Sequence, residues 1–116
     1  MLDAKARSIA LLRRWLTAEQ REDFDKTGTF IAVGDFTKAK YRIGQKSFFN
    51  IIDLSDNSEI CFEPDCSYSA PIGDKMLAQK LAIEGNEKLV LEIANRMANG
   101  RLLTIINALA DGDGVL

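Results

Sequence analysis

Three basic side chains recur at every second residue in one short stretch of the chain: Lys38, Lys40 and Arg42. Successive side chains of a β-strand point to opposite faces, so this spacing predicts a row of positive charge along about 14 Å of strand. Such a row could bind phosphate groups, an acidic protein surface or a second copy of the chain. A solvated strand face explains the same spacing without any ligand, and both interpretations stay open.

The charge of the whole chain limits what this basic row can do. The formal net charge is −2 and the isoelectric point is about 5.1. Residues 53–74 carry carboxylates but no basic side chain, so positive and negative charge are segregated along the sequence. We therefore expect weak nonspecific binding to nucleic acid, and we favour a protein partner or a second copy of the chain.

Two further groups of polar residues are candidates for a site. Asn50 stands between phenylalanine and isoleucine residues, and a buried amide without hydrogen-bond partners would cost about 1–3 kcal/mol. We therefore expect Asn50 to bond the backbone of a turn or bulge. Gln79, Lys80 and Asn95 could form a polar cluster against a sheet. The simpler alternative is a surface ion pair between Lys80 and Glu84, four residues apart on a helix.

Several kinds of catalytic and metal site are excluded by the lack of histidine. They include Ser-His-Asp and Cys-His catalysis and His-bearing zinc sites. Cys61 and Cys66 lack the further ligands of a tetrahedral site, so we expect both to be reduced and metal-free. We assign no catalytic residue, no metal and no cofactor. A histidine-independent enzyme remains as an alternative with a pocket formed by Tyr41, Asn50, Lys80 and Asn95.

The elements that must position these residues begin with a helical hairpin. Residues 2–16 show apolar positions at helical spacing, and a second helix runs to about Lys26. Thr17 and Gln20 form a capping-box pattern at the start of this second helix, and Gly28 is a typical residue for its end. The pattern therefore predicts two helices within residues 1–28.

A strand pattern replaces the helical one in residues 29–63. Runs rich in β-branched or aromatic residues, at 29–34, 38–43, 48–54 and 59–63, are separated by short polar turns. Such short connections predict a four-stranded antiparallel meander, because parallel neighbours need longer crossovers. In this sheet Tyr41 and Ile43 would face the core, and the basic row would face the other side.

Helical spacing returns after this sheet. Asp74 would cap a helix that runs to about residue 84, and a break at Gly85 and Asn86 would lead into a second helix over 87–99. A last helix at 101–110 and a flexible tail at 111–116 would follow. The chain is thus expected to be a single α+β domain over 1–116, with helices in 72–110 packed on the sheet. The expected core cluster is Tyr41, Ile43, Ile60, Phe62, Leu77, Leu81 and Ile93.

Membrane and export signals are missing from the sequence. No apolar run approaches the roughly 18 residues that a membrane span needs. The first stretch of the chain carries charges where a signal peptide has an apolar core. We therefore expect a cytoplasmic protein without a membrane partner.

An ordered set of short motifs covers residues 15–95. They are a Tyr-Arg-Ile strand, an Asn-Ile strand, a Cys before a Pro, and Leu-Ala-Gln-Lys-Leu after an acidic residue, followed by Glu and Ala-Asn. In this order the motifs resemble a poorly characterised small domain of bacterial and phage-associated proteins. The resemblance implies the same domain boundaries and implies no activity. The matching residues are Tyr41, Arg42, Ile43, Asn50, Ile51, Cys61, Pro64, Pro71, Asp74, Leu77, Ala78, Gln79, Lys80, Leu81, Glu84, Ala94 and Asn95.

The function favoured by these observations is a non-catalytic protein-interaction module of bacterial or phage origin. The first alternative is a nucleic-acid-associated regulator, or a small phage-type inhibitor of a host nucleic-acid machine, that uses the basic row. The second alternative is the histidine-independent enzyme. The predicted binding residues are Lys38, Lys40, Arg42, Asn50, Gln79, Lys80 and Asn95.

Overall fold

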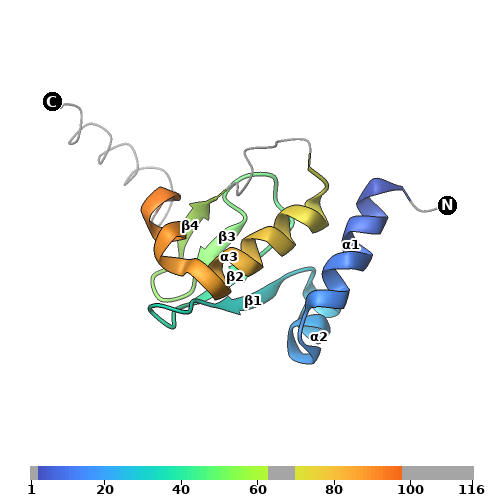
Figure 1. Ribbon diagram of the computed structural model, residues 1–116, viewed down its shortest axis with the longest axis horizontal. Helices are drawn as coiled ribbons and strands as arrows, with labels where there is room; N and C mark the ends of the chain where they lie inside the picture. Colours follow the sequence, from blue (N-terminus) through green and yellow to red (C-terminus); the bar gives the residue numbers. More distant parts are fainter. Residues whose placement is uncertain (1–2, 63–69, 98–116) are drawn as a thin grey trace, which may run out of the picture.

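The computed structural model describes residues 3–62 and 70–97 (Figure 1). Helices precede and follow a sheet, which confirms the predicted α+β class. The elements are α1 (Ala4–Trp15), α2 (Ala18–Thr27), β1 (Phe30–Val33), β2 (Lys40–Ile43), β3 (Ile51–Asp53), β4 (Ser58–Cys61), α3 (Ile72–Ile93) and β5 (Asn95–Met97).

The N-terminal helical hairpin forms as its capping residues predict. The carboxylate of Asp3 accepts the backbone N–H of Ala6 at 2.7 Å and caps α1. Thr17 and Gln20 exchange both hydrogen bonds of a capping box at the start of α2. Gly28 ends α2 with φ of +77°, a left-handed conformation that glycine adopts without a steric penalty.

The sheet is an antiparallel meander in which each strand pairs with the next along the chain. The four predicted strands are present as β1 to β4, although β3 begins only at Ile51. A further strand, β5, pairs with β4 through the residue pair Cys61 and Asn95. The prediction of helix over 87–99 is therefore wrong beyond Ile93, because the backbone turns extended at Ala94 and supplies an edge strand.

Helix α3 is one long element with a break at the predicted place. Asn86 has non-helical dihedral angles and separates two helical halves. Asp74 lies in the first turn and is not the cap as predicted, since the helix starts at Ile72. The side chain of Ser8 in α1 takes the capping role instead, and its Oγ accepts the N–H of Gly73 at 3.0 Å. Helix α1 therefore lies against the first turns of α3 (Figure 1).

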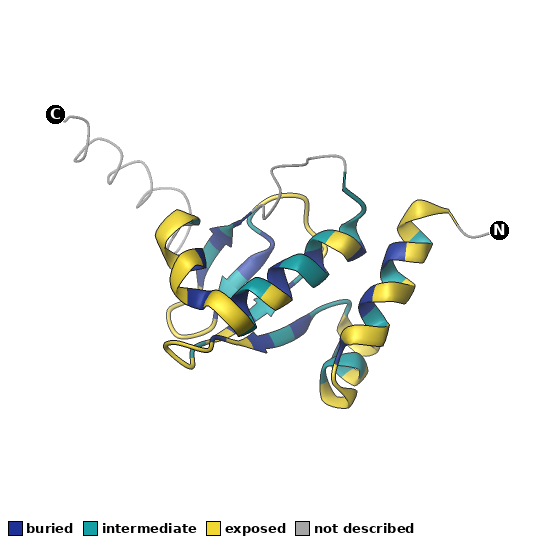
Figure 2. Cartoon of the chain, viewed as in Figure 1, coloured by how far each residue is buried: buried dark blue, intermediate teal, exposed yellow. Residues whose placement is uncertain are grey.

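Burial alternates along the strands (Figure 2), so the two faces of the sheet differ in burial. We call the side that faces α3 the inner face, because its side chains are buried with those of the helix. Opposite lies the outer face, whose side chains range from half-buried to exposed. The buried apolar core is Leu12, Leu16, Phe24, Phe30, Ala32, Tyr41, Ile43, Ile51, Ile60, Phe62, Met76, Ile83 and Val90.

The predicted core is confirmed for the sheet and partly wrong for α3. Leu77 is only half-buried against the core, whereas Leu81 and Ile93 are 47% and 57% exposed. Met76 and Ile83 occupy the buried face instead. The helix is rotated relative to the prediction because its buried face also carries polar residues, which hydrophobic periodicity does not count as core.

One set of predictions falls on parts of the chain that the structure does not describe. The predicted helix at 101–110, the tail at 111–116 and Cys66 lie outside the described residues. None of the helices within residues 3–62 and 70–97 combines the length and apolar character that a membrane crossing requires.

Candidate functional site

The outer face of the sheet carries hollows that could bind a ligand or partner. It is formed by alternating apolar and charged side chains: Ile31, Val33, Lys40, Arg42, Ile52 and Glu59. Helix α2 meets the sheet at β1, and α3 packs on the opposite side. The middle of the outer face is therefore left open, and three hollows lie along it.

The largest of the three lies where β1, α2 and α3 meet, and we call it the edge hollow. Its volume is about 430 Å³. Val33 and Lys40 are cross-strand neighbours on its floor. Two acidic residues, Glu19 and Glu84, are among those that line it. The lining residues are Thr17, Glu19, Gln20, Ile31, Val33, Lys40 and Glu84.

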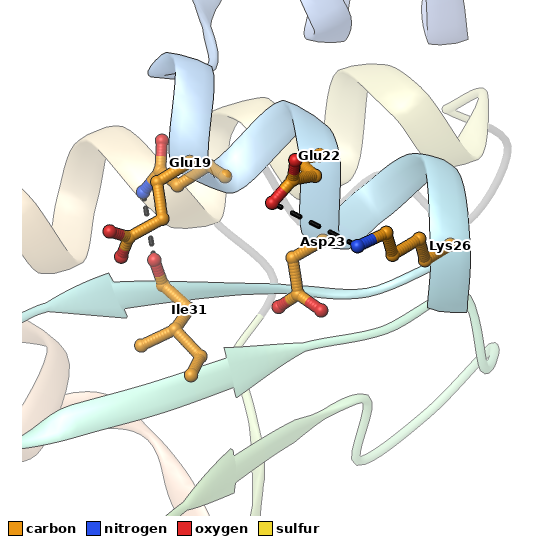
Figure 3. A pocket seen from close by; sticks show the side chains of 6 residues that line it. Glu19, Glu22, Asp23, Lys26 and Ile31 are labelled. Atoms are coloured by element: carbon orange, nitrogen blue, oxygen red, sulfur yellow. Dashed lines mark hydrogen bonds and ion pairs between the residues drawn. The ribbon is translucent and has the colours of Figure 1, made fainter.

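A second hollow, of about 280 Å³, adjoins the edge hollow under α2 (Figure 3). The two hollows share Glu19, Gln20 and Ile31. Figure 3 shows Asp23 pointing from α2 over the strands, and the Lys26 ammonium facing Glu22 at 3.9 Å. This ion pair is highly exposed and contributes little to stability.

The third hollow, of about 260 Å³, is built by the turn between β2 and β3. Its walls include Arg42, Phe49 and Ile52, so apolar surface and a guanidinium meet in it. Phe49 adopts φ of +51°, an uncommon conformation for a non-glycine residue, and Asn50 fixes the turn behind it. Lys46 and Glu59 close the far side with an ion pair at 3.4 Å.

The predicted basic row is not formed in the expected way. Lys38 precedes β2, has φ of +64°, and directs its ammonium to the backbone carbonyl of Asp35 at 3.0 Å. Arg42 lies on the outer face, where it donates to Asp23 at 3.2 Å and to Thr29 at 2.7 Å. Among the three basic residues, only Lys40 has an ammonium without a hydrogen bond or ion pair in the described part of the chain.

The predicted hydrogen bond from Asn50 to the backbone of a turn is confirmed. Its Nδ2 donates to the carbonyl of Gly44 at 3.0 Å. Asn50 and Gln79 also exchange two side-chain hydrogen bonds, at 2.7 and 3.0 Å, and Gln79 donates to the carbonyl of Phe62. This buried amide pair joins the β2–β3 turn to α3, so two of the predicted binding residues are in contact in the core.

The predicted ion pair between Lys80 and Glu84 is present, but Lys80 is buried and the pair is not at the surface as predicted. Its ammonium lies 2.6 Å from the Glu84 carboxylate, and its side chain is 7% exposed. Glu84 in turn accepts a hydrogen bond from Gln20, which also donates to the carbonyl of Ile31. The predicted contact of Lys80 with Asn95 lies outside what is described, because only the backbone of β5 is described.

Sequence reasoning missed a buried carboxylate at Glu87. This carboxylate accepts the N–H groups of Phe36 and Thr37 at 3.0 and 2.7 Å, and the Tyr41 hydroxyl at 2.6 Å. The Thr37 hydroxyl donates to it as well. The N–H of Glu87, which the break at Asn86 frees from the helix, donates to the carboxylate of Asp35 at 3.0 Å.

The carboxylate of Glu87 fixes the β1–β2 loop to α3. A side chain at Gly34 would overlap this carboxylate, so a larger residue there would displace it. Burial would raise the pKa of Glu87, but the hydrogen bonds from Thr37 and Tyr41 and from the loop backbone hold that pKa below its usual range. Burial and the neighbouring Glu87 carboxylate raise the pKa of the Tyr41 phenol. Helical spacing between Ile83 and Val90 was the available sign that Glu87 faces inward.

Comparison with known proteins found no match for this chain. No family model, no curated protein and no solved structure matches the chain. Within residues 3–62 and 70–97, no three or more cysteine, aspartate or glutamate side chains are grouped so that they could hold a metal ion. The candidate site is thus defined by geometry alone, as an open sheet face with three hollows, two of which adjoin.

Proposed function

We propose that the chain is a protein-interaction module that binds its partner through the outer face. The observation that carries this proposal is the difference between the faces: the inner face is closed by α3, and the outer face combines half-buried apolar side chains with charges and hollows. Mixed apolar and charged surface with concave regions is typical of non-obligate protein interfaces. The resemblance to small bacterial and phage-associated domains supports a bacterial or phage origin.

The arrangement of the buried polar groups supports binding over catalysis. Glu87, Tyr41 and the amide pair of Asn50 and Gln79 are occupied by hydrogen bonds within the protein. None of the three hollows described above is lined by Tyr41, Asn50 and Lys80 together. The pairing of Arg42 with Asp23 gives the nucleic-acid alternative less support than the protein alternative, because this guanidinium is already neutralised.

A pair of matched variants tests the proposed face. Ile52→Lys adds a charge to the half-buried centre of the outer face, and Leu81→Lys adds the same charge to the exposed side of α3. Proteins captured by the wild-type chain from an extract of its native host are purified, and their binary binding to all three chains is measured. We expect Ile52→Lys to weaken binding about tenfold or more, and Leu81→Lys to change it less than about twofold.

Two results would count against this proposal. If Leu81→Lys abolished binding of the purified partner and Ile52→Lys did not, the interface would lie on α3 and not on the outer face. Tight, salt-sensitive binding to random duplex DNA that Lys40→Ser abolishes would favour the nucleic-acid alternative, since phosphate contacts weaken steeply with salt.

A further inference from the structure

The edge hollow holds two exposed, oppositely charged side chains that lack ion-pair partners. Glu19 and Lys40 both line this hollow. Neither makes an ion pair within the described residues. By contrast, Asp23 and Arg42 lie 3.2 Å apart, and Lys46 is 3.4 Å from its own acidic partner. Free charge of both signs is therefore concentrated in one part of the outer face.

Apolar surface accompanies these charges. Val33 is 43% exposed beside Lys40, and Ile31 completes the floor of the hollow. An exposed apolar floor between charges is a common arrangement at protein interfaces, where burial of the floor stabilises the complex and the charges select the partner.

One backbone acceptor of the edge strand β1 is already occupied by a side chain. β1 is at the end of the sheet, where a free backbone could pair with another strand. The side chain of Gln20 donates to the carbonyl of Ile31 at 2.8 Å and occupies this acceptor in the middle of β1. An added strand would have to compete with Gln20 for this acceptor, so we expect contacts in the edge hollow to be made mainly by side chains.

We infer, on the basis of the proposed function, that the partner in the edge hollow is a second copy of this chain. A two-fold axis through the hollow would place Lys40 of each copy against Glu19 of the other, over a shared floor of Ile31 and Val33. A patch that carries both signs of charge is complementary to itself under two-fold symmetry. A uniformly acidic or basic partner would leave one of the two charges opposite a like charge, which is unfavourable.

A charge-swap experiment tests this arrangement. Lys40→Glu and Glu19→Lys each replace both attractive pairs of the dimer with repulsive ones. Sedimentation of the full chain over a concentration series should show a dimer for the wild type and a dissociation constant about a hundredfold higher for each variant. Raising the salt concentration should weaken the wild-type dimer.

Mixing the two variants tests directly whether Lys40 of one copy faces Glu19 of the other. An equal mixture of Lys40→Glu and Glu19→Lys should recover a heterodimer, because both pairs across the interface then join opposite charges again. In one pair the introduced carboxylate of the first variant faces the introduced ammonium of the second. In the other pair the native Glu19 of the first variant faces the native Lys40 of the second.

Two further variants serve as matched controls. Lys5→Glu and Glu92→Lys make the same charge changes at exposed positions that do not line the hollow. Their dissociation constants should lie within about twofold of the wild-type value. Thermal unfolding of all four variants confirms that each is folded before its association is measured, which matters for Glu19 in the first turn of α2.

The outcomes separate this inference from the proposed function. A wild-type chain that stays monomeric at the highest concentration, or a variant mixture that does not recover the heterodimer, would overturn the second copy as partner. If in that case a purified host protein still loses binding with Ile52→Lys, the outer face keeps its proposed role. A wild-type dimer that both variants leave intact would also overturn the inference.

Discussion

The inner and outer faces of the same sheet use polar side chains in opposite ways. On the inner face, Glu87 and the pair of Asn50 and Gln79 are buried, and their hydrogen bonds are made within the protein. On the outer face, Arg42 and Lys40 remain half-buried or exposed beside apolar side chains. Buried polar groups must be paired because an unpaired one costs about 1–3 kcal/mol. The inner polar groups therefore define how α3 and the loops sit. On the outer face, Arg42 is paired with Asp23, and Lys40 has no hydrogen bond or ion pair within the described residues.

Removal of the Glu87 carboxylate should give the largest loss of stability. Glu87→Ala leaves the loop N–H groups and the Tyr41 hydroxyl without their acceptor, so we expect a loss of about 4 kcal/mol in the free energy of unfolding. Denaturant titration measures this value. Glu92→Ala, an exposed carboxylate on the same helix, should change it by less than about 0.5 kcal/mol. Similar values for the two variants would show that Glu87 does not hold the loop.

The same carboxylate predicts a dependence on pH. Hydrogen bonds lower the pKa of Glu87 in the folded chain, so its contribution is present above the unfolded pKa and is lost as the pH falls through the folded value. Glu87→Gln should cost about 2 kcal/mol at neutral pH, and this difference should shrink below about pH 4. A difference that stays constant down to acidic pH would contradict the ionised state of Glu87.

The orientation of α3 gives the next largest effect. Met76 is fully buried, whereas Leu81 is 47% exposed. Met76→Ala should cost about 3 kcal/mol, and Leu81→Ala less than about 1 kcal/mol. The free energies of unfolding of these two variants should therefore differ clearly. The reverse order would restore the helix orientation that hydrophobic spacing predicts.

The contact between α1 and α3 depends on a missing side chain at Gly73. A Cβ atom there would overlap the backbone of Ser8, so Gly73→Ala should cost about 2 kcal/mol. Gly85 has open space around it, and Gly85→Ala should be neutral or stabilising by up to about 1 kcal/mol. Equal melting temperatures for the two variants would argue against the close approach of the helices.

The outer face should give the smallest change in stability. Ile52→Lys removes a half-buried side chain whose neighbours are Arg42 and Glu59, so we expect a loss of at most about 1 kcal/mol. Thermal unfolding of the variant measures this loss. A loss comparable to that of Glu87→Ala would mean that Ile52 belongs to the core and that the two faces are not different in role.

Local patterns were sufficient to predict the helical hairpin and the first four strands. Thr17, Gln20 and Gly28 have capping roles that depend only on neighbouring backbone groups, so the sequence reveals them directly. The role of Asn50 could also be inferred, because a buried amide among apolar residues needs partners close by. In these cases the physical cause lies within a few residues of its effect.

The burial of polar residues on α3 and the hollows of the outer face depend on tertiary contacts, and the sequence patterns did not predict them. Glu87 is bonded to residues from Asp35 to Tyr41, far away in the sequence, and these bonds make a charged residue part of the core. Gln79 is buried on the same helix for the same reason, because it bonds Asn50 and Phe62, and Lys80 is buried beside it in an ion pair with Glu84. These buried polar side chains rotate α3 away from Leu81. The hollows of the outer face likewise depend on how α2 meets β1 and could not be read from spacing.

Isoleucine methyl groups on both faces allow the most direct test of the division between them. Ile31 and Ile52 lie on the outer face, and Ile43, Ile51 and Ile60 lie on the inner face. Methyl NMR spectra of the labelled chain are followed as unlabelled chain is added and, where that causes no change, as the purified host partner is added. We predict that binding shifts the Ile31 and Ile52 signals and leaves the inner-face signals in place. Saturable binding that shifts the signal of Ile93 on α3 and leaves Ile31 and Ile52 unchanged would contradict the outer face as the binding surface.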